Sequence, residues 1–217
     1  MQGSPSPEMY LIHEGWLACS VTVIDGGRQI VSLHTPGDLV GFSTAHCATA
    51  FDQIHAISDA VVSIVKHSVL SNVFEQRPRL AQYLMAKSQE YQVSLMNRLV
   101  SLGRTDAIAR VSALIGELVE RHVNAGGKEH DSIAVPLRQP DIAELTGLTS
   151  VHVNRMLRQL RERGIADWSA GVIRVQDPAA LAAVAGIQRK LPRSIPDPVR
   201  CPVDSSGYDH KPHGIVA

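Results

Sequence analysis

Residues 145–164 have the types and spacing that fit contact with nucleic acid; they read LTGLTSVHVNRMLRQLRERG. The second half of this stretch is a helix pattern with arginines along one side. Residues 150–163 contain four arginines and one acidic residue, Glu162, whereas the whole chain has 21 basic and 21 acidic side chains. Bulk charge therefore does not indicate a nucleic-acid partner, and the basic face is local. Such a face provides the attraction that backbone phosphates require.

Individual side chains on that helix could read bases. The guanidinium of Arg155 can bind guanine through two hydrogen bonds, and Asn154 or Ser150 can add polar contacts. Val151 offers only an apolar contact, for example to a thymine methyl group. His152 is open to two interpretations, a base contact or an incidental exposed histidine. The arginines also have an alternative interpretation as an ordinary solvated helix face.

Two short helices and a glycine turn would hold these side chains. Pro140 suits the first turn of the first helix, and Asp141 suits the positive end of the helix dipole. Gly147 suits a left-handed helix end, and Thr149 suits the N-cap of the second helix. On the inner side of the second helix, apolar residues recur at helical spacing, at Val153, Leu157 and Leu160. This layout predicts a helix-turn-helix, in which the start of the second helix meets base edges in the major groove.

A strand pair and a closing helix are expected after the second helix. Residues 165–175, IADWSAGVIRV, read as strand, turn and strand, with the tip at residues 169–171. This pattern predicts a wing that lies along the DNA backbone. Further on, Asp177 suits an N-cap and Gly186 suits the end of a short helix. The glycine turn, the N-cap, the apolar inner side of the second helix and the wing all fit one winged helix-turn-helix. We therefore favour DNA binding over the interpretation of the arginines as a solvated helix face.

A long helix is predicted upstream, over residues 79–102. Within it apolar side chains recur at separations of 7, 4, 4 and 3 residues, at Leu84, Tyr91, Leu95, Leu99 and Leu102. A narrow seam of this heptad type predicts pairing with an identical helix, and packing on the helix's own domain is the alternative. Gly103 is expected to break this helix, and Thr105 is expected to cap the next one.

The N-terminal part has the texture of short strands. Residues 17–24 and 28–35 flank residues 25–27, DGG, which are a strong hairpin signal. Residues 36–38, PGD, predict another turn, and residues 60–66, AVVSIVK, predict another strand. The sequence therefore predicts an α+β chain, with a small β-roll or sandwich followed by helices.

Composition and motifs exclude several classes of protein. The apolar fraction of 44% is ordinary for a globular chain. Three scattered cysteines, Cys19, Cys47 and Cys201, argue against a disulfide framework and for a reducing cytosol. No signal peptide and no membrane span is recognisable, so a cytoplasmic protein with no membrane partner is expected. An enzyme is not expected: GxSxG, phosphate-loop and metal-ligand motifs are missing, and turn chemistry accounts for Asp38.

The sequence resembles the cyclic-AMP receptor protein/FNR (Crp/Fnr) family of bacterial transcription regulators over about residues 10–186. The resemblance rests on GDLVG in the roll, on the long helix, and on DIAELTGLTSVHVNRMLRQLRERG. It implies a sequence-specific, DNA-binding transcription regulator that acts as a homodimer on an inverted-repeat site and contacts RNA polymerase. The candidate DNA-binding residues are Arg138, Gln139 and Thr149 for phosphates, Ser150, Val151, His152 and Arg155 for bases, and Asn154 and Arg158 on the same exposed face.

The resemblance also implies an organisation. We expect a disordered start at residues 1–9, a cyclic-nucleotide-binding-like β-roll at 10–76, a dimerisation helix at 77–103, a winged helix-turn-helix at 104–186 and a disordered tail at 187–217. The sensor of this family usually has further strands and a helix before the first strand found here. The roll is therefore expected to be shortened.

The resemblance constrains the effector. Cyclic-nucleotide binders of the family have Glu after the glycine of the GDxxG turn and an Arg-Ser pair beyond it, whereas here Phe42 follows Gly41 and residues 43–56 hold no arginine. Without a cation to offset the phosphate charge, cyclic AMP is not expected as the effector. Iron–sulfur sensing is not expected either, because it uses four cysteine ligands. Many relatives have Glu where Val151 stands, so the preferred DNA sequence is expected to differ.

The effector itself stays unknown, no cofactor is predicted, and haem is an open hypothesis. Five histidines of the sensor segment show no HxH or HExxH spacing, so ordinary surface or core roles are favoured over metal binding. They are His13, His34, His46, His55 and His67. An alternative function is a degenerate regulator that serves as a protein-interaction or heterodimer partner with weak DNA binding.

Overall fold

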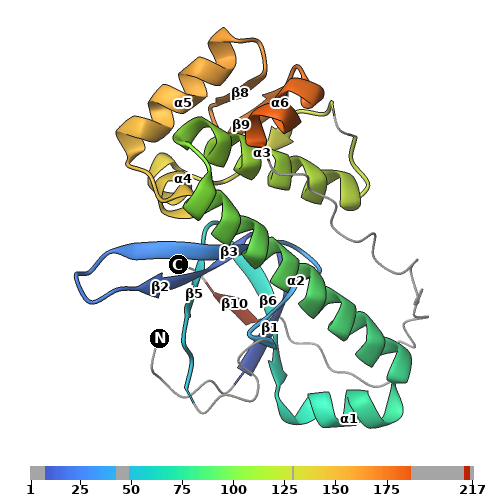
Figure 1. Ribbon diagram of the computed structural model, residues 1–217. Helices are drawn as coiled ribbons and strands as arrows, with labels where there is room; N and C mark the ends of the chain where they lie inside the picture. Colours follow the sequence, from blue (N-terminus) through green and yellow to red (C-terminus); the bar gives the residue numbers. More distant parts are fainter. Residues whose placement is uncertain (1–7, 43–48, 129, 187–212, 216–217) are drawn as a thin grey trace. The chain divides into compact units, whose positions relative to one another are not determined.

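The computed structural model describes residues 8–42, 49–128, 130–186 and 213–215. It divides into two compact units, Met1–Ser94 with Lys190–Ala217 and Leu95–Arg189 (Figure 1). The first unit is built mainly from strands and the second mainly from helices, so the predicted α+β class is confirmed. In the described part of the chain, no helix is long and apolar enough to cross a membrane.

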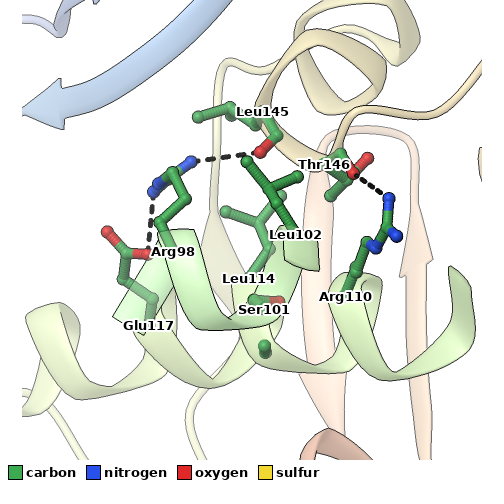
Figure 2. Close-up of a pocket in the computed structure, with 9 residues that line it drawn as sticks. Arg98, Ser101, Leu102, Arg110, Leu114, Glu117, Leu145 and Thr146 are labelled. Atoms are coloured by element: carbon green, nitrogen blue, oxygen red, sulfur yellow. Dashed lines mark hydrogen bonds and ion pairs between the residues drawn. The ribbon is translucent and has the colours of Figure 1, made fainter. Parts of the chain in front are cut away.

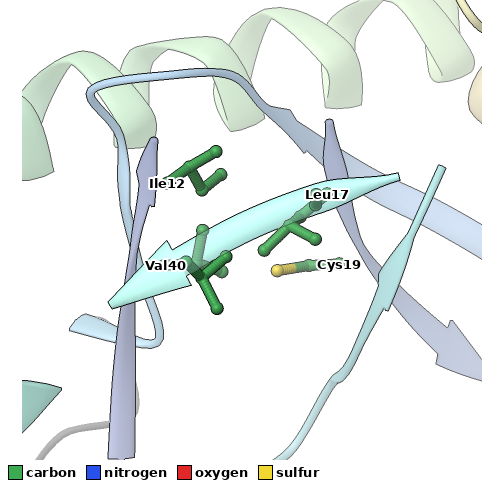
Figure 3. Packing of buried hydrophobic residues seen from close by; sticks show 6 residues of the cluster. Ile12, Leu17, Cys19 and Val40 are labelled. Atoms are coloured by element: carbon green, nitrogen blue, oxygen red, sulfur yellow. The ribbon is translucent and has the colours of Figure 1, made fainter. Parts of the chain in front are cut away.

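The first unit contains two antiparallel sheets. One has the order β10-β6-β1-β4, formed by His213–Ile215, Ala60–Lys66, Glu8–Glu14 and Leu39–Val40. The other has the order β3-β2-β5, formed by Arg28–His34, Leu17–Thr22 and Gln53–Ala56. Buried side chains from both sheets pack against one another as a single cluster (Figure 3), made of Ile12, Leu17, Cys19, Val40, Ala60 and Val62.

Both turns predicted in this unit are present. In the hairpin between β2 and β3, Gly26 has a φ of 85°, and the N–H of Gly27 donates to the Asp25 carboxylate at 2.9 Å. In the PGD turn, the N–H of Thr35 donates to the Asp38 carboxylate at 2.9 Å. Turn chemistry therefore accounts for Asp38, as predicted.

A third turn brings two backbones close together. Gly15 follows β1 directly and has a φ of 79°. A Cβ at this position would collide with the backbone carbonyl of Asp59 and would lie 2.7 Å from the Cα of Ala60. Only glycine fits this close approach without strain.

Two short segments that we expected to be disordered are strands. Met9 is fully buried in β1, where it pairs with Val65 of β6. Residues 213–215, expected within a disordered tail, form β10 and pair with the other edge of β6. Both predictions were wrong because strand pairing satisfies backbone groups that local sequence does not reveal. Residues 1–7 and 187–212 lie outside the described part, so disorder there stays a prediction.

Helices α1 (Ser68–Gln76) and α2 (Pro78–Arg104) follow the strands. The predicted break at Gly103 was wrong, because α2 continues to Arg104 and a single glycine costs a helix only about 1 kcal/mol. The predicted cap at Thr105 was also wrong. Asp106 caps α3 (Ala107–Asn124) by accepting the N–H of Ala109 at 3.0 Å, while the Thr105 hydroxyl donates to the Ser101 carbonyl at 2.7 Å.

The predicted seam of α2 is largely turned toward the chain itself. Leu84 packs against the buried pair Met9 and Leu70, and the Tyr91 ring lies 5.9 Å from that of His34. Within the second unit, Leu102 packs against the helix-turn-helix and is only partly exposed. For these positions the alternative interpretation, packing on their own domain, is the one that the structure supports.

A second heptad stripe on α2 is exposed instead. It recurs at separations of 3 and 4 residues and lies about 100° around the helix from the predicted seam. Its members, which we call the exposed stripe, are Gln82, Met85, Gln89, Gln92, Met96, Leu99 and Gly103. Leu99, with 72% of its surface exposed, is the one residue that both stripes share.

The second unit packs helices on a small sheet. Its helices after α3 are α4 (Gln139–Thr146), α5 (Ser150–Glu162) and α6 (Pro178–Ala185). The sheet has the order β7-β9-β8, formed by Ile133–Ala134, Val172–Val175 and Ala166–Ser169. The sequence predicted β8, β9 and α6 but not β7. The largest fully buried side chains of this unit are Val111, Ile115, Leu118, Leu145, Val153, Leu160 and Ile173.

Candidate DNA-binding site

The turn between α4 and α5 has the predicted geometry. Gly147 lies in the left-handed region with φ 63° and ψ 37°, and its N–H donates to the Ala143 carbonyl. Thr149 is the N-cap of α5, and its hydroxyl accepts the N–H of His152 at 3.3 Å. These two positions fix where α4 ends and where α5 begins, so they set the direction of the second helix.

The buried side of α5 anchors it to the unit. Val153, Leu157 and Leu160 are buried, as predicted. Met156 is buried as well and was missed, although it lies three residues after Val153 on the same helix side. This inner stripe leaves the opposite side of α5 free to face a partner.

The outward side of α5 carries the candidate base contacts. Val151 has 77% of its surface exposed, and its side chain fits an apolar contact in a groove. Arg155 is exposed and forms no hydrogen bond or ion pair with any described residue. Ser150 is half-buried. His152 is exposed, and its Nδ1 lies 3.2 Å from the Thr149 hydroxyl, so its ring is held at the helix start.

Two further candidates are exposed arginines, one at the start of α4 and one on α5. The Arg138 side chain is 82% exposed at the start of α4, and its backbone N–H donates to the Asp141 carboxylate at 2.8 Å. Arg158 is exposed and lies 3.7 Å from Glu162 across one helical turn, a surface pair that DNA phosphates can displace. These positively charged candidates are therefore exposed, at the start of α4 and along α5.

Two candidates bind each other. Gln139, at the start of α4, and Asn154, on α5, form two reciprocal side-chain hydrogen bonds of 2.5 and 2.9 Å. From the sequence we expected separate roles toward DNA for the two residues, and no local pattern indicated that they would pair. The two amides link the first and second helices of the motif on its exposed surface.

Two partly buried arginines, which the sequence analysis missed, hold the end of α4 (Figure 2). Arg98 donates to the Leu145 carbonyl at 3.3 Å, and Arg110 donates to the Thr146 carbonyl at 3.5 Å. Arg98 also forms a 2.9 Å ion pair with Glu117. These carbonyls belong to the last turn of α4, where backbone acceptors have no partner within the helix. The arginines come from α2 and α3, so nothing in the local sequence of the motif points to them.

The wing has the predicted strand–turn–strand form. Its tip uses a positive φ at Ala170 (49°) and at Gly171 (73°). At its base, hydrogen bonds from Arg161 and Ser169 outweigh partial burial and hold the pKa of Asp167 below its usual range. Arg161 and Asp167 lie 2.6 Å apart, so the wing is tied to the end of α5.

The β-roll shows a different kind of polar cluster. The Cys19 sulfur lies 3.6 Å from His34 Nε2, which in turn lies 2.9 Å from the Ser32 hydroxyl. Burial, with a smaller contribution from the charge of Asp52, raises the pKa of the Cys19 thiol to about 12, so it stays protonated. Burial therefore disfavours the thiolate form of Cys19, which is the form that acts as a nucleophile.

The candidate sensor residues are only partly described. Phe42 packs beside Met9 and Leu70, while residues 43–48, with His46 and Cys47, lie outside the described part, as does Cys201. Two of the other sensor histidines contact serines: His13 Nε2 lies 2.7 Å from Ser63, and His55 Nδ1 lies 3.4 Å from Ser20, whereas the buried Nε2 of His67 has no hydrogen-bond partner among the described residues. Within the described ranges no group of three or more potential ligands could hold a metal ion.

Comparison with known proteins agrees with this architecture. A Crp-like helix-turn-helix domain matches residues 109–184, and a cyclic nucleotide-binding domain matches residues 1–77. The nitrogen fixation regulation protein FixK of Rhizobium meliloti (strain 1021) is 29% identical over 184 residues, which cover 84% of this chain and 81% of that protein. The electron transport regulator A of Shewanella oneidensis is 24% identical over 86% of this chain and 74% of its own length.

A solved structure shows the same fold. FixK2 from Bradyrhizobium japonicum superimposes with a TM-score of 0.76 at 28% identity, over 87% of this chain and 92% of the other. The two domain matches and this superposition follow the order of elements found here, from β-roll through long helix to helix-turn-helix. The chain belongs to the Crp/Fnr family and is a transcription regulator with a helix-turn-helix DNA-binding domain.

Proposed function

We propose that this regulator acts as a homodimer that reads an inverted-repeat DNA site through the exposed side of α5. The observation that carries the proposal is this surface itself. It combines a guanidinium at Arg155 that pairs with none of the described residues with an apolar side chain at Val151, of which 77% is exposed, on a helix whose start is fixed by Thr149. A solvated helix face needs no exposed valine and no fixed start.

In this proposal the roles of the side chains are divided. Arg155 binds guanine, Val151 contacts a thymine methyl group, and Ser150 and His152 add polar contacts to base edges. Arg138, Thr149 and Arg158 bind phosphates and set the register of the helix in the groove. Gln139 joins this phosphate-binding group, next to the positive end of the α4 dipole.

The proposed homodimer pairs through the exposed stripe of α2. Its heptad spacing is that of two helices packed side by side, and its occupant is a second copy of this chain because each helix offers the same stripe. Met85, Met96 and Leu99 have 48%, 66% and 72% of their surfaces exposed, which is costly to leave in water. A dimer would place two recognition helices on one face of the DNA, with half-sites about one helical turn apart.

The effector of the regulator is not assigned, and we propose that it is not cyclic AMP. Phe42 packs among apolar side chains where the cyclic-nucleotide binders of the family have a ribose-binding glutamate. We further propose that the DNA-bound dimer contacts RNA polymerase and catalyses no reaction itself.

Selection of binding sites from random duplex DNA, with purified protein and no added effector, tests the DNA-reading part. Enrichment of an inverted repeat is the expected result. On the enriched site, Arg155→Ala should cost about 1–3 kcal/mol and relax the base preference at one position of each half-site. An equal loss on every sequence would show that Arg155 touches phosphate alone. A folded dimer that enriches no site would favour a role as a protein-interaction or heterodimer partner.

Sedimentation measures the dimer part separately. The double variant Met96→Glu with Leu99→Glu places charges in the exposed stripe and should yield monomers. Leu80→Glu is the matched control, because Leu80 is an exposed apolar residue of the same helix but lies off the stripe. Dimers that survive the double variant would rule out this interface.

A further inference from the structure

The paired amides of Gln139 and Asn154 carry a further inference about how the site is built. The Nε2 of Gln139 donates to Oδ1 of Asn154 at 2.5 Å, and the Nδ2 of Asn154 donates to Oε1 of Gln139 at 2.9 Å. Both residues are exposed, so the ring of two hydrogen bonds lies on the surface that the proposed function turns toward DNA.

The hydrogen-bonding capacity of the pair limits what it can do. Each primary amide has two N–H donors and an oxygen with two lone pairs. The reciprocal bonds use one N–H and one lone pair of each residue. One outward donor and one acceptor position remain on each side chain, in a direction that the partner amide fixes.

The positions of the two residues differ in what they can reach. Gln139 stands at the first position of α4, ahead of Pro140, where the positive end of the helix dipole favours an anion and the Asp141 carboxylate accepts the Arg138 N–H. Asn154 lies on α5 about 100° around the helix from Arg155, so it is displaced from the side chain that is best suited to read a base. The contact with Gln139 accounts for the orientation of Asn154.

We propose that Asn154 is a positioning residue: it holds the amide of Gln139 in place for a DNA phosphate and reads no base itself. This inference rests on the proposed docking of α5. A free glutamine has three rotatable bonds, and immobilising such a side chain on binding costs roughly 0.5–1.5 kcal/mol. Because Asn154 holds Gln139 in one conformation in the free protein, the entropy cost of immobilising Gln139 does not reduce the free energy of DNA binding.

A double-mutant cycle tests the proposal. Gln139→Ala, Asn154→Ala and the double variant are compared with the unchanged chain on the selected site, on sites with single base changes and on random-sequence duplex. Each single variant should weaken binding by roughly three- to tenfold on all of these DNAs. The double variant should bind no more weakly than either single one, because both disrupt the same unit.

Two results would overturn the inference. One is a changed base preference in Asn154→Ala, as expected for Arg155→Ala, which would make Asn154 a base contact. The other is an additive loss in the double variant, which would make the two residues independent. Random-sequence duplex reports phosphate contacts even if no site is enriched, so failure of sequence reading and failure of this inference give different results.

An exchanged pair separates positioning from simple loss of a side chain. Gln139→Asn with Asn154→Gln keeps the total length of the two side chains and both amide groups. It should recover most of the affinity that either single exchange loses, because the reciprocal bonds can form again. Equal thermal melting temperatures for all variants would exclude misfolding as the cause, and lack of any recovery would contradict the pairing role.

Discussion

The winged-helix unit and the β-roll unit use their buried polar groups differently. In the winged-helix unit, buried polar side chains serve nearby backbone: Asp141 accepts the N–H of Arg138, and the Thr146 hydroxyl donates to the Ile142 carbonyl at 2.7 Å. In the roll, Asp52 and Ser32 are buried beside Cys19, a residue distant from both in sequence. Helix caps act on backbone groups a few residues away, so they can be predicted from the sequence. A polar cluster formed across strands depends on how the whole sheet is assembled, so it cannot.

Each unit carries its own reporter for testing this difference. The chain has two tryptophans, and Trp16 lies in the first unit while Trp168 lies in the second. Replacing one of them by Phe leaves fluorescence that follows the unfolding of one unit in urea. The variants below are best measured in both of these backgrounds, because a two-domain chain need not unfold in a single step.

The largest expected effect is in the roll. Gly15→Ala should destabilise the first unit by about 3 kcal/mol or more, because its Cβ meets the backbone at Asp59 and Ala60 and its φ is positive. Gly147→Ala is the matched variant in the second unit and should cost about 1–2 kcal/mol, since its Cβ meets side chains and no backbone, Leu102 at 3.1 Å and Arg110 at 3.7 Å. Similar losses in both would show that backbone strain alone decides the cost.

The next effect is at the end of α4. Arg98→Met should destabilise the second unit by about 2 kcal/mol, because it leaves the Leu145 carbonyl and the largely buried Glu117 without their donor. The loss is limited because Arg121 still pairs with Glu117 at 3.4 Å. Adding Glu117→Met should recover part of the loss in the urea midpoint. No recovery would mean that the carbonyl contact dominates.

A smaller effect is expected at the start of α5. Thr149→Ala removes the hydroxyl that accepts the His152 N–H and should cost about 1 kcal/mol in the second unit. Thr149→Ser keeps an acceptor and should leave the unfolding midpoint nearly unchanged. If the serine variant loses as much as the alanine variant, the threonine methyl group rather than the cap is responsible.

The smallest effect has the opposite sign. Burial, which a hydrogen bond with Cys19 only partly offsets, raises the pKa of Asp52 above its usual range. The folded roll therefore holds this proton more tightly than the unfolded chain, so ionisation lowers stability as the pH rises above about 4. Asp52→Asn should stabilise the first unit at neutral pH and should give no gain below about pH 4.

Asp38→Asn is the control for that variant. The Asp38 carboxylate accepts the N–H of Thr35, so the loss of its charge should weaken the turn at neutral pH. Urea unfolding at two pH values measures both variants. Destabilisation by Asp52→Asn at neutral pH would show that the buried carboxylate is a favourable partner for Cys19 and not a burden on the roll.

How far the sequence could predict this molecule follows from the range of each interaction. Gly147, Thr149 and the DGG hairpin were predictable because each acts on backbone groups within a few residues. The pairing of β10 with β6 was not, since an edge strand accepts a distant segment without a local signal. On α2, the pairing seam predicted from the sequence lies about one residue away from the exposed stripe. Both sides of this helix carry heptad spacing, and only the fold decides which side is covered.

The candidate site shows the same limit. The candidate residues of α5 were chosen from spacing and residue type, and all of them are exposed except Ser150, which is half-buried. What escaped was the support behind the site: Arg98 and Arg110 bind α4 from other helices, and Gln139 binds Asn154. Contacts that long side chains make between different helices produce no periodic pattern in a sequence, so they could not be predicted from it.

The three glutamines in the exposed stripe, Gln82, Gln89 and Gln92, bear on how the regulator would respond to its own abundance. Polar residues at such positions weaken helix pairing compared with an all-apolar seam. Below the concentration at which subunits pair, the amount of dimer grows with the square of subunit concentration, so doubling synthesis gives about four times the dimer. A modest change in gene expression would then become a steeper change in operator occupancy, with no ligand involved.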